Sequence, residues 1–367
     1  MKIGIITFHR AHNYGAVLQC YALSHILKSL GAHVDIIDYY PSYFKEEYAF
    51  FPKKKFLSFS LKSKISFFIK FLLTIVPRYR RYKGFNQFIK RLPLSSVIYD
   101  QDSKFPELYD CIFWGSDQVW NPLLTCGEDR FFAGNFTKGN TRFIAYAAST
   151  SPRLLNMKYR EYFCDIISRF DNISTREVGF CQYLNNLQKG CALNVLDPVL
   201  LLKKSAWEQL SKRTSLKDYL LIYTVPQNRK IYQIATKIAR KKNLRIIEIR
   251  PSVILSFRQN LLQDSSPNEF LGLFLNSSFV VTTSFHGTAF SVKFQKNFIT
   301  LKMNSDIDAR ASNLLTSLDL TDRLVDDYDD NVIDNNINYA VVDQKLNILI
   351  NDSFNYIRNS LNENFVD

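Results

Sequence analysis

Apolar and polar positions follow two different periods along most of the chain, and their order predicts strands that alternate with helices. Residues 2–8 alternate with the period of a half-buried strand, residues 17–30 carry apolar side chains at helical spacing, and residues 33–39 form a second β-rich run. Gly31 ends the predicted helix. Together the three segments predict one βαβ unit, with its two strands parallel in the same sheet.

The same alternation continues through the rest of the chain. Further strands are predicted at residues 109–115, 142–148, 172–175, 219–225, 244–250, 279–283 and 298–302, and helices at residues 158–170, 229–242, 267–276, 286–295 and 308–318. We therefore predict an α/β fold with two Rossmann-like, doubly wound domains facing a cleft. The predicted division is an N-terminal, acceptor-side domain at residues 1–190, a C-terminal, donor-side domain at residues 191–340 and a closing helix at residues 341–367. A ligand should bind in the cleft, outside the carboxyl ends of the strands.

Residues 50–92 interrupt the first domain with a segment that is both basic and apolar. Phe, Leu and Ile are interleaved there with Lys and Arg, and residues 53–91 contain no acidic side chain. The segment does not offer the roughly 18 uncharged residues of a membrane span. It suits either of two roles: a surface that lies in the headgroup layer of a membrane, or a helical insertion that packs on the domain and exposes a basic face to solvent.

Charge and cysteine content narrow the class of partner. The excess of 47 Lys and Arg over 34 Asp and Glu gives a net charge of +13, which favours an anionic partner. We expect no nucleic-acid binding, because no recognition motif accompanies the charge. The six cysteines lack metal-ligand spacing, and the first residues read as a strand instead of a signal peptide. We therefore expect a cytoplasmic protein with reduced thiols and no metal site.

Residues 280–294 contain a candidate anion site, where a predicted buried strand turns into a helix. The first N–H groups of such a helix are unpaired and attract anions. The hydroxyls of Ser284 and Thr288 can donate hydrogen bonds there, and Gly287 allows a ligand to approach the backbone. His286 can supply a proton or a charge-assisted hydrogen bond. The alternative is a histidine that makes only structural hydrogen bonds.

Seven segments of the chain resemble, in order, segments of the polysaccharide pyruvyl transferases. They are ITFHRAHNYGAVLQCYAL near the N-terminus, FWGSDQVWNP at residues 113–122, FIAYAASTS at 143–151, ISTREVG at 173–179, LDPVLLL at 196–202, TTSFHGTAFSVKFQKNF at 282–298, and residues 310–315. One such segment would be weak evidence, whereas seven in this order are specific. The resemblance implies a fold like that of GT-B glycosyltransferases. It also implies transfer of pyruvate from phosphoenolpyruvate onto two hydroxyls of a sugar, which forms a cyclic ketal and releases phosphate.

The resemblance assigns roles on the donor side. His286 is expected to protonate the methylene carbon of phosphoenolpyruvate, because a histidine charged by a nearby phosphate is a suitable acid. Arg176 matches an arginine that the family uses on the donor, although it could instead form an ion pair with the glutamate that follows it. Some relatives have an arginine where this chain has Ser284. We expect Arg310, or next Arg250, to replace that cation.

The acceptor side rests on the segment GSDQVWNP. Trp120 could stack on a sugar ring, while Gln118 and Asn121 bind hydroxyl groups. Asp117 could be the base that accepts a hydroxyl proton. The alternative is a tryptophan that packs under a turn capped by Asp117.

Side chains that follow the first strand form a second group of acceptor candidates. These are His9, His12, Asn13, Tyr14 and Gly15. Asn13 is also a candidate N-cap of the helix, and we expect only part of this group to contact ligand. Two serines after a later strand are candidates of lower rank at the cleft edge: Ser149 and Ser151.

These observations lead to one main prediction and two alternatives. The main prediction is a cytoplasmic enzyme, peripheral at the inner membrane through residues 50–92. It would build a pyruvate ketal on a hexose such as galactose, in a capsular or exopolysaccharide repeat unit carried by polyprenyl diphosphate. Phosphoenolpyruvate would be the donor, with no further cofactor. The alternatives are a GT-B glycosyltransferase that uses a nucleotide sugar, and a non-catalytic polysaccharide-binding protein.

Overall fold

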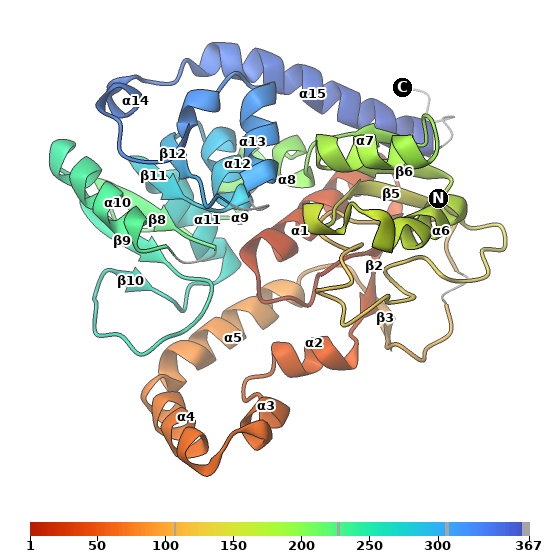
Figure 1. Cartoon of the computed structure of the whole chain (residues 1–367), viewed down its shortest axis with the longest axis horizontal. Helices are drawn as coiled ribbons and strands as arrows, with labels where there is room; N and C mark the ends of the chain where they lie inside the picture. The colour runs from red at the N-terminus through yellow and green to blue at the C-terminus, as the bar shows by residue number, and fades with distance from the viewer. Residues whose placement is uncertain (106–107, 226–227, 305–307, 362–367) are drawn as a thin grey trace.

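The computed structural model describes residues 1–105, 108–225, 228–304 and 308–361. It contains two parallel β-sheets with helices packed on them (Figure 1). The first sheet has the order β3-β2-β1-β4-β5-β6-β7, formed by β1 (Lys2–Ile6), β2 (His33–Tyr39), β3 (Leu94–Tyr99), β4 (Cys111–Trp114), β5 (Arg142–Ala148), β6 (Asn172–Thr175) and β7 (Ala192–Asn194). The second has the order β10-β9-β8-β11-β12-β13, formed by β8 (Tyr219–Tyr223), β9 (Arg245–Ile249), β10 (Leu261–Leu262), β11 (Phe279–Thr282), β12 (Asn297–Leu301) and β13 (Leu324–Val325).

The helices connect these strands in the manner of βαβ units. They are α1 (Tyr14–Ser29), α2 (Ser42–Glu47), α3 (Lys53–Ser58), α4 (Leu61–Leu73), α5 (Ile75–Ile89), α6 (Arg160–Arg169), α7 (Val178–Leu187), α8 (Pro198–Leu201), α9 (Lys204–Leu210), α10 (Lys230–Lys241), α11 (Pro267–Asn276), α12 (Phe285–Lys293), α13 (Asp308–Ser317), α14 (Asp330–Asp334) and α15 (Tyr339–Ser360). The predicted fold class, two Rossmann-like domains, is confirmed.

Central strands of both sheets are buried along their whole length. Every residue of β4, β8 and β11 is buried, as expected for parallel strands covered by helices on both faces. The carboxyl ends of β1 and β4 are in register, as are those of β8 and β11. The loops that leave these ends therefore gather at one edge of each sheet, which is where ligands bind in open α/β sheets.

Helix α1 joins the two domains. The Tyr14 ring stacks on Phe270 of α11 with centroids 4.4 Å apart, and its hydroxyl donates to the backbone oxygen of Ser265 at 2.8 Å. One apolar cluster continues from α1 into the second domain and includes Val17 and Leu221. Apolar packing thus holds the domains together beside the polar cluster described below.

The domain boundaries differ slightly from the prediction. Strand β7 (Ala192–Asn194) pairs with β6, so the first domain continues past residue 190. The closing helix α15 begins at Tyr339 instead of residue 341 and returns to the first domain, where Arg142 donates to the backbone oxygens of Ser360 and Leu361, both at 2.9 Å. In Figure 1 this helix runs across both domains.

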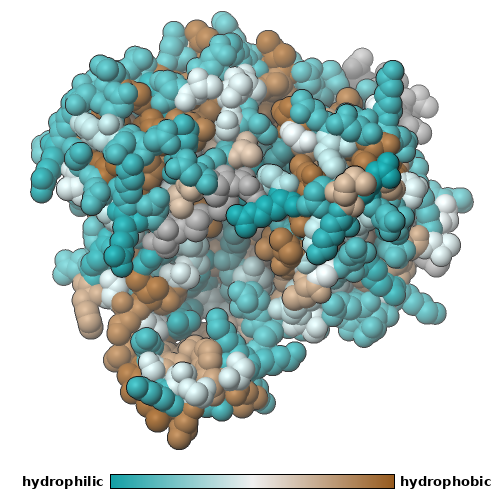
Figure 2. Space-filling view, in the orientation of Figure 1, coloured by the Kyte–Doolittle hydropathy of each residue, from teal (hydrophilic) through white to brown (hydrophobic). Residues whose placement is uncertain are grey.

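Residues 50–92 form a helical lobe, made by α3, α4 and α5, that projects from the body of the molecule (Figure 1). Phenylalanine rings pack against one another inside it, with Phe51 5.0 Å from Phe71 and Phe56 5.8 Å from Phe67 between centroids. Its outer face exposes large apolar side chains, which Figure 2 shows as brown atoms. These are Leu57, Leu61, Ile65, Phe68, Ile69, Leu72, Leu73, Ile75, Val76 and Tyr79. Of the helices that the structure describes, none is long and apolar enough to cross a bilayer.

Candidate active site

Two helix N-termini meet at the interface between the domains. Asn13 caps α1, as predicted, because its side-chain oxygen accepts hydrogen bonds from Gly15 N at 2.9 Å and Ala16 N at 3.4 Å. Ser284 occupies the same position before α12, but its hydroxyl makes no capping hydrogen bond. The positive end of α12 is therefore left without a side-chain cap, which makes it available to an anion.

His286 lies in the first turn of α12 and packs on α1. A Cβ atom at position 15 would lie 2.1 Å from His286 Nδ1, so only glycine leaves room for the imidazole there. The side chain of His286 is 10% exposed, and its buried Nε2 atom has no hydrogen-bond partner among the residues that the structure describes; it lies 3.7 Å from Asp197 Oδ2. Buried polar atoms are nearly always paired, so this nitrogen is available to bond a ligand.

Opposing effects act on the pKa of His286. Burial lowers it most, the Asp197 carboxylate raises it, and the Arg176 guanidinium lowers it again, with a net shift below the ordinary value of 6.5. The imidazole is therefore neutral at neutral pH in this state. An anion bound beside Nε2 would raise the pKa and favour the charged form.

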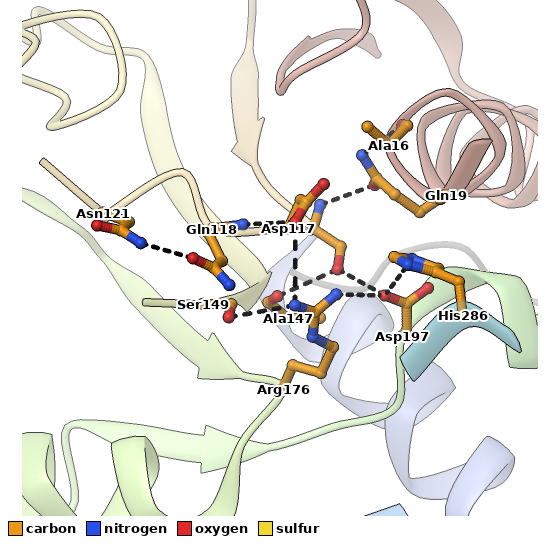
Figure 3. Close-up of polar contacts among 12 residues, drawn as sticks. Ala16, Gln19, Asp117, Gln118, Asn121, Ala147, Ser149, Arg176, Asp197 and His286 are labelled. Carbon is orange, nitrogen blue, oxygen red and sulfur yellow. Dashed lines mark hydrogen bonds and ion pairs between the residues drawn. The ribbon is translucent and has the colours of Figure 1, made fainter. Parts of the chain in front are cut away.

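Arg176 follows β6 and is the centre of a buried polar cluster (Figure 3). Its guanidinium donates to Asp197 Oδ2 at 2.8 Å, to Glu177 Oε1 at 3.1 Å and to Ser149 Oγ at 3.2 Å. The alternative that we considered for Arg176, an ion pair with Glu177, is thus present. The same guanidinium also stacks on Phe285 of α12, 4.7 Å from the ring centroid, so Arg176 couples the first domain to the site around His286.

Asp197 connects this arginine to the histidine. Its Oδ2 atom accepts hydrogen bonds from Arg176 and from Ser116 Oγ, the latter at 3.1 Å, and faces His286 Nε2. In Figure 3 Asp197 lies between Arg176 and His286. A carboxylate placed in this way orients the imidazole and stabilises its charged form.

Asp117 lies on the other side of Arg176, 4.0 Å from its guanidinium. Its backbone has a φ of 81°, a conformation that residues other than glycine rarely adopt and that is concentrated at functional sites. The backbone oxygen of Asp117 accepts from Ser149 N at 3.0 Å, which holds the loop against the end of β5. The structure thus brings Asp117 into the same cluster as Arg176, as a base for an acceptor hydroxyl requires.

Arg310 completes the cluster from the second domain. When the side-chain amide of Gln118 is oriented to satisfy its hydrogen bonds, its oxygen accepts from both terminal nitrogens of Arg310, at 2.9 Å each. Burial and the charge of Arg176 lower the pKa of Arg310. Arg250, the other cation considered, instead lies 3.5 Å from Glu248. A cavity of about 90 Å³ is lined by Arg176, Asp197, Phe285 and Arg310, among others.

Several acceptor predictions are wrong in this structure because the side chains are used inside the protein. Trp120 is fully buried, donates to Phe132 O at 3.1 Å and packs edge-on against Phe170, so no face is open to a sugar. His9 is also fully buried and pairs with Asp38 at 3.0 Å. Tyr14 is buried in the domain interface.

Two donor predictions need the same correction. Thr288 is fully buried, and its hydroxyl bonds Ser284 O at 3.1 Å and Thr300 Oγ1 at 2.7 Å, so it does not face a ligand. Gly287 is required for a different reason from the one predicted. A Cβ there would lie 2.1 Å from Thr282 Oγ1, so this glycine lets α12 pack on β11.

The remaining candidates lie around the cluster. Asn121 is buried beside Gln118, with 2.6 Å between the two side-chain amides. Ser149 belongs to the cluster through Arg176, and it also donates to Glu177 Oε1 at 2.8 Å. Ser151 lies outside it, before a 3-10 turn. His12 lies away from the cluster, where its ring stacks on Phe85 with centroids 5.2 Å apart.

Three polar members of the cluster were not predicted: Ser116, Gln19 and Asp197. Gln19 of α1 holds the Asp117 loop, because its side-chain oxygen accepts from Ser116 N at 3.1 Å. Asp197 caps α8 by accepting from Val199 N at 3.0 Å, so its sequence context, Asp before Pro at a helix start, suggests a cap alone. Among the described residues, no group of three or more His, Cys, Asp or Glu side chains is placed to hold a metal ion.

Comparison with solved structures supports the fold. A protein from Listeria monocytogenes assigned as a UDP-N-acetylglucosamine 2-epimerase matches with a TM-score of 0.55 and 9% identity, over 100% of this chain and 97% of that one. The UDP-GlcNAc 2-epimerase of Methanocaldococcus jannaschii (TM-score 0.48, 10% identity, 96% and 93% covered) and the glycotransferase of kitacinnamycin (0.42, 10%, 100% and 99%) are also similar. The match with a TM-score of 0.55 has 9% identity, so it shows only the fold, a GT-B-like arrangement of two Rossmann-like domains.

The family follows from the sequence. The model of the polysaccharide pyruvyl transferase family matches residues 13–305. The chain therefore belongs to the polysaccharide pyruvyl transferase family and is a transferase, which confirms the predicted resemblance. A comparison with curated proteins finds no match.

Proposed function

We propose that this transferase moves the pyruvyl group of phosphoenolpyruvate onto two hydroxyls of a hexose, forming a cyclic ketal and releasing phosphate. The observation that carries the proposal is the unpaired Nε2 atom of His286. It is buried between the domains, beside the Arg176–Asp197 pair and at the uncapped end of α12. A proton donor next to an anion-binding helix end is what protonation of phosphoenolpyruvate requires.

The proposed reaction has two additions to one carbon. His286 gives a proton from Nε2 to the methylene carbon of phosphoenolpyruvate, and a sugar hydroxyl oxygen bonds to the neighbouring carbon while Asp117 accepts its proton. A second hydroxyl then attacks the same carbon, and the bond to the phosphate oxygen breaks. Of the two hydroxyl protons, one restores His286 and the other leaves on hydrogen phosphate, so atoms and charge balance.

Charge in the site decides which groups can hold the donor. Arg176 is already paired with Asp197 and Glu177, so it is better suited to positioning those carboxylates than to binding phosphate by itself. The donor's negative charge would be met by Arg310, by the N–H groups of α12 and by His286 once it is protonated. Because binding the anion raises the pKa of His286, the donor itself would produce the charged acid.

The products distinguish this proposal from its alternatives. The purified protein, incubated with phosphoenolpyruvate and a galactose-containing acceptor, should release inorganic phosphate and add one carboxylate-bearing ketal per acceptor, as measured by a phosphate assay and mass spectrometry. Release of a nucleotide from a nucleotide sugar, with phosphoenolpyruvate inert, would identify a glycosyltransferase instead. Acceptor binding without either product would identify a binding protein.

We propose further that the acceptor is carried on a polyprenyl diphosphate, and that the exposed apolar face of α4 meets the membrane where this lipid lies. The face combines Ile65, Phe68 and Ile69, which are 55%, 48% and 52% exposed, with the lysines at positions 62, 64 and 70. Apolar side chains can enter the headgroup layer while lysines attract anionic lipids.

Replacing Ile65, Phe68 and Ile69 by serine should weaken binding to phosphatidylglycerol vesicles by at least about tenfold, because each large apolar side chain contributes roughly 1.5–3 kcal/mol when it leaves water. The measurement is vesicle co-sedimentation. A control variant with serine at the exposed positions Met157, Leu193 and Ile348 should bind vesicles like the wild type. Equal binding by both variants would show that α4 does not contact the membrane.

A further inference from the structure

A cavity of about 410 Å³ lies between the helical lobe and the domain interface. Its walls come from four parts of the chain: the loop before α1, the end of α2, the lobe, and the segment after β9 in the second domain. The lining residues used below are Lys55, Phe67, Arg78, Arg81, His12 and Tyr48. Glu46 and Glu47 also line it, and Glu46 accepts a hydrogen bond from Lys54 N at 2.6 Å.

Two arginines in this cavity donate hydrogen bonds to neutral groups. Arg81 is 7% exposed and donates to Tyr14 Oη at 2.8 Å and to the backbone oxygen of His12 at 2.9 Å. Arg78 is half-buried and donates through Nε to Thr74 Oγ1 at 2.8 Å. In the described parts of the chain, neither guanidinium forms an ion pair with a carboxylate. A buried cation without a counter-charge is costly, and an anionic ligand would offset that cost.

The inner end of the cavity lies beside the loop before α1. The ring of Tyr48 lies 5.5 Å from that of His12 between centroids, and His12 directly precedes the N-cap of α1, the helix on which His286 packs. Burial raises the pKa of Tyr48, and the carboxylates of Glu47 and Asp117 raise it further, so the phenol lies within electrostatic reach of the proposed base.

The helical lobe that forms the outer wall of the cavity also carries the exposed apolar face. Phe67 of α4 lines the wall, and the next two residues, Phe68 and Ile69, belong to the exposed apolar face. Lys55 of α3 also lines the cavity and is exposed. A ligand that filled the cavity would therefore contact the loop before α1 and Tyr48, the two arginines, and the lobe that carries the exposed apolar face.

We propose that this cavity holds the phosphate groups of a lipid-linked glycan acceptor, with Arg78, Arg81 and Lys55 contacting the phosphates. The glycan would extend past Tyr48 toward Asp117, and the lipid would follow the apolar face of α4. This inference rests on the proposed function only for the claim that the glycan receives the pyruvyl group. The proposed phosphate contacts depend only on the residues that line the cavity, so the two parts can be tested separately.

The test uses a double variant, Arg78→Gln with Lys55→Gln, because Arg81 also holds Tyr14 and its loss could unfold the interface. Binding of geranylgeranyl diphosphate, kept below its micelle concentration, should weaken by about tenfold or more, because each lost charge-assisted hydrogen bond is worth roughly 1.5–3 kcal/mol. In transfer assays, KM for a polyprenyl-diphosphate-linked acceptor should rise by a similar factor. Transfer to a free oligosaccharide should stay unchanged.

The matched control is Arg80→Gln with Lys83→Gln, on the side of α5 that lines a different cavity. It should bind geranylgeranyl diphosphate like the wild type, and equal losses of affinity in both double variants would overturn the proposal.

Inorganic pyrophosphate should bind more weakly than geranylgeranyl diphosphate, and equal affinities would overturn the assignment to a lipid-linked ligand. If no pyruvyl transfer is found but the lipid diphosphate binds through Arg78 and Lys55, the phosphate site stands and the proposed function fails.

Discussion

Replacing His286 by alanine should lower kcat for phosphate release from phosphoenolpyruvate by about a thousandfold or more. A general acid typically raises the rate of a reaction by roughly 10²–10⁴-fold. Among the described residues, the other side chains that contact Asp197 are Ser116 and Arg176, and neither is a suitable proton donor at neutral pH. The fold should persist, because alanine leaves the first turn of α12 intact. The measurement is steady-state phosphate release with ketal formation followed by mass spectrometry.

A second variant separates the position of the imidazole from its presence. In Gly15→Ala the added methyl group would overlap His286 Nδ1, so the ring must move although its chemistry is retained. Activity in this variant should also fall sharply, and the melting temperature should fall as well, because the buried ring has to shift to make room for the methyl group. Wild-type rates in His286→Ala would contradict the assignment of the acid.

The pH dependence follows from the same assignment. The acid acts when protonated, so kcat/KM should fall as pH rises through the pKa of free His286, which lies below 6.5. The bound donor adds negative charge and raises this pKa, so the corresponding fall in kcat should occur at higher pH. Superimposable profiles for kcat and kcat/KM would show that no anion binds beside this histidine.

Arg176→Lys should fold but lose activity by roughly 10²–10³-fold. Lysine keeps the positive charge that Asp197 and Glu177 require, yet a single ammonium cannot replace a guanidinium that contacts Asp197, Glu177 and Ser149 at once. The Asp197 carboxylate would lose its fixed orientation toward His286. The measurement is kcat for the ketal product, with folding followed by circular dichroism.

The stability of a second variant tests whether Arg176 neutralises the buried carboxylates. Arg176→Gln leaves two buried carboxylates without their counter-charge, so its free energy of unfolding should fall by about 3–5 kcal/mol. A matched control is Arg142→Lys, at the far end of the same sheet, where the arginine contacts α15. This control should keep near wild-type kcat. Full activity in Arg176→Lys would mean that the guanidinium does not position the site.

Helices and strands with a regular spacing of apolar residues could be predicted from the sequence. Edge strands of the sheets, whose spacing is less regular, could not. Strands β8, β9, β11 and β12 fall where the apolar runs place them, within one or two residues. Strand β3 (Leu94–Tyr99) was missed because half of its residues are exposed, and β10 and β13 because they have two residues each. Short edge strands bury too few side chains to leave a pattern.

The candidate site divides in a similar way. The strand-to-helix turn at His286 could be predicted because glycine and histidine interrupt an apolar run there. Asp197 could not, since its role depends on three partners from distant segments that only the tertiary structure brings together. Trp120 was misassigned because a sequence does not show whether an aromatic ring faces solvent or core. Motifs therefore located the loops of the site, while packing decided which side chains in each loop face it.

The most direct test of the central claim is a crystal structure of the protein with phosphoenolpyruvate. The account predicts that the donor lies at the N-terminus of α12, with its methylene carbon within about 3–3.5 Å of His286 Nε2. Arg310 should contact its phosphate or carboxylate. Donor density at another place, with His286 Nε2 still unpaired beside Asp197, would contradict the account.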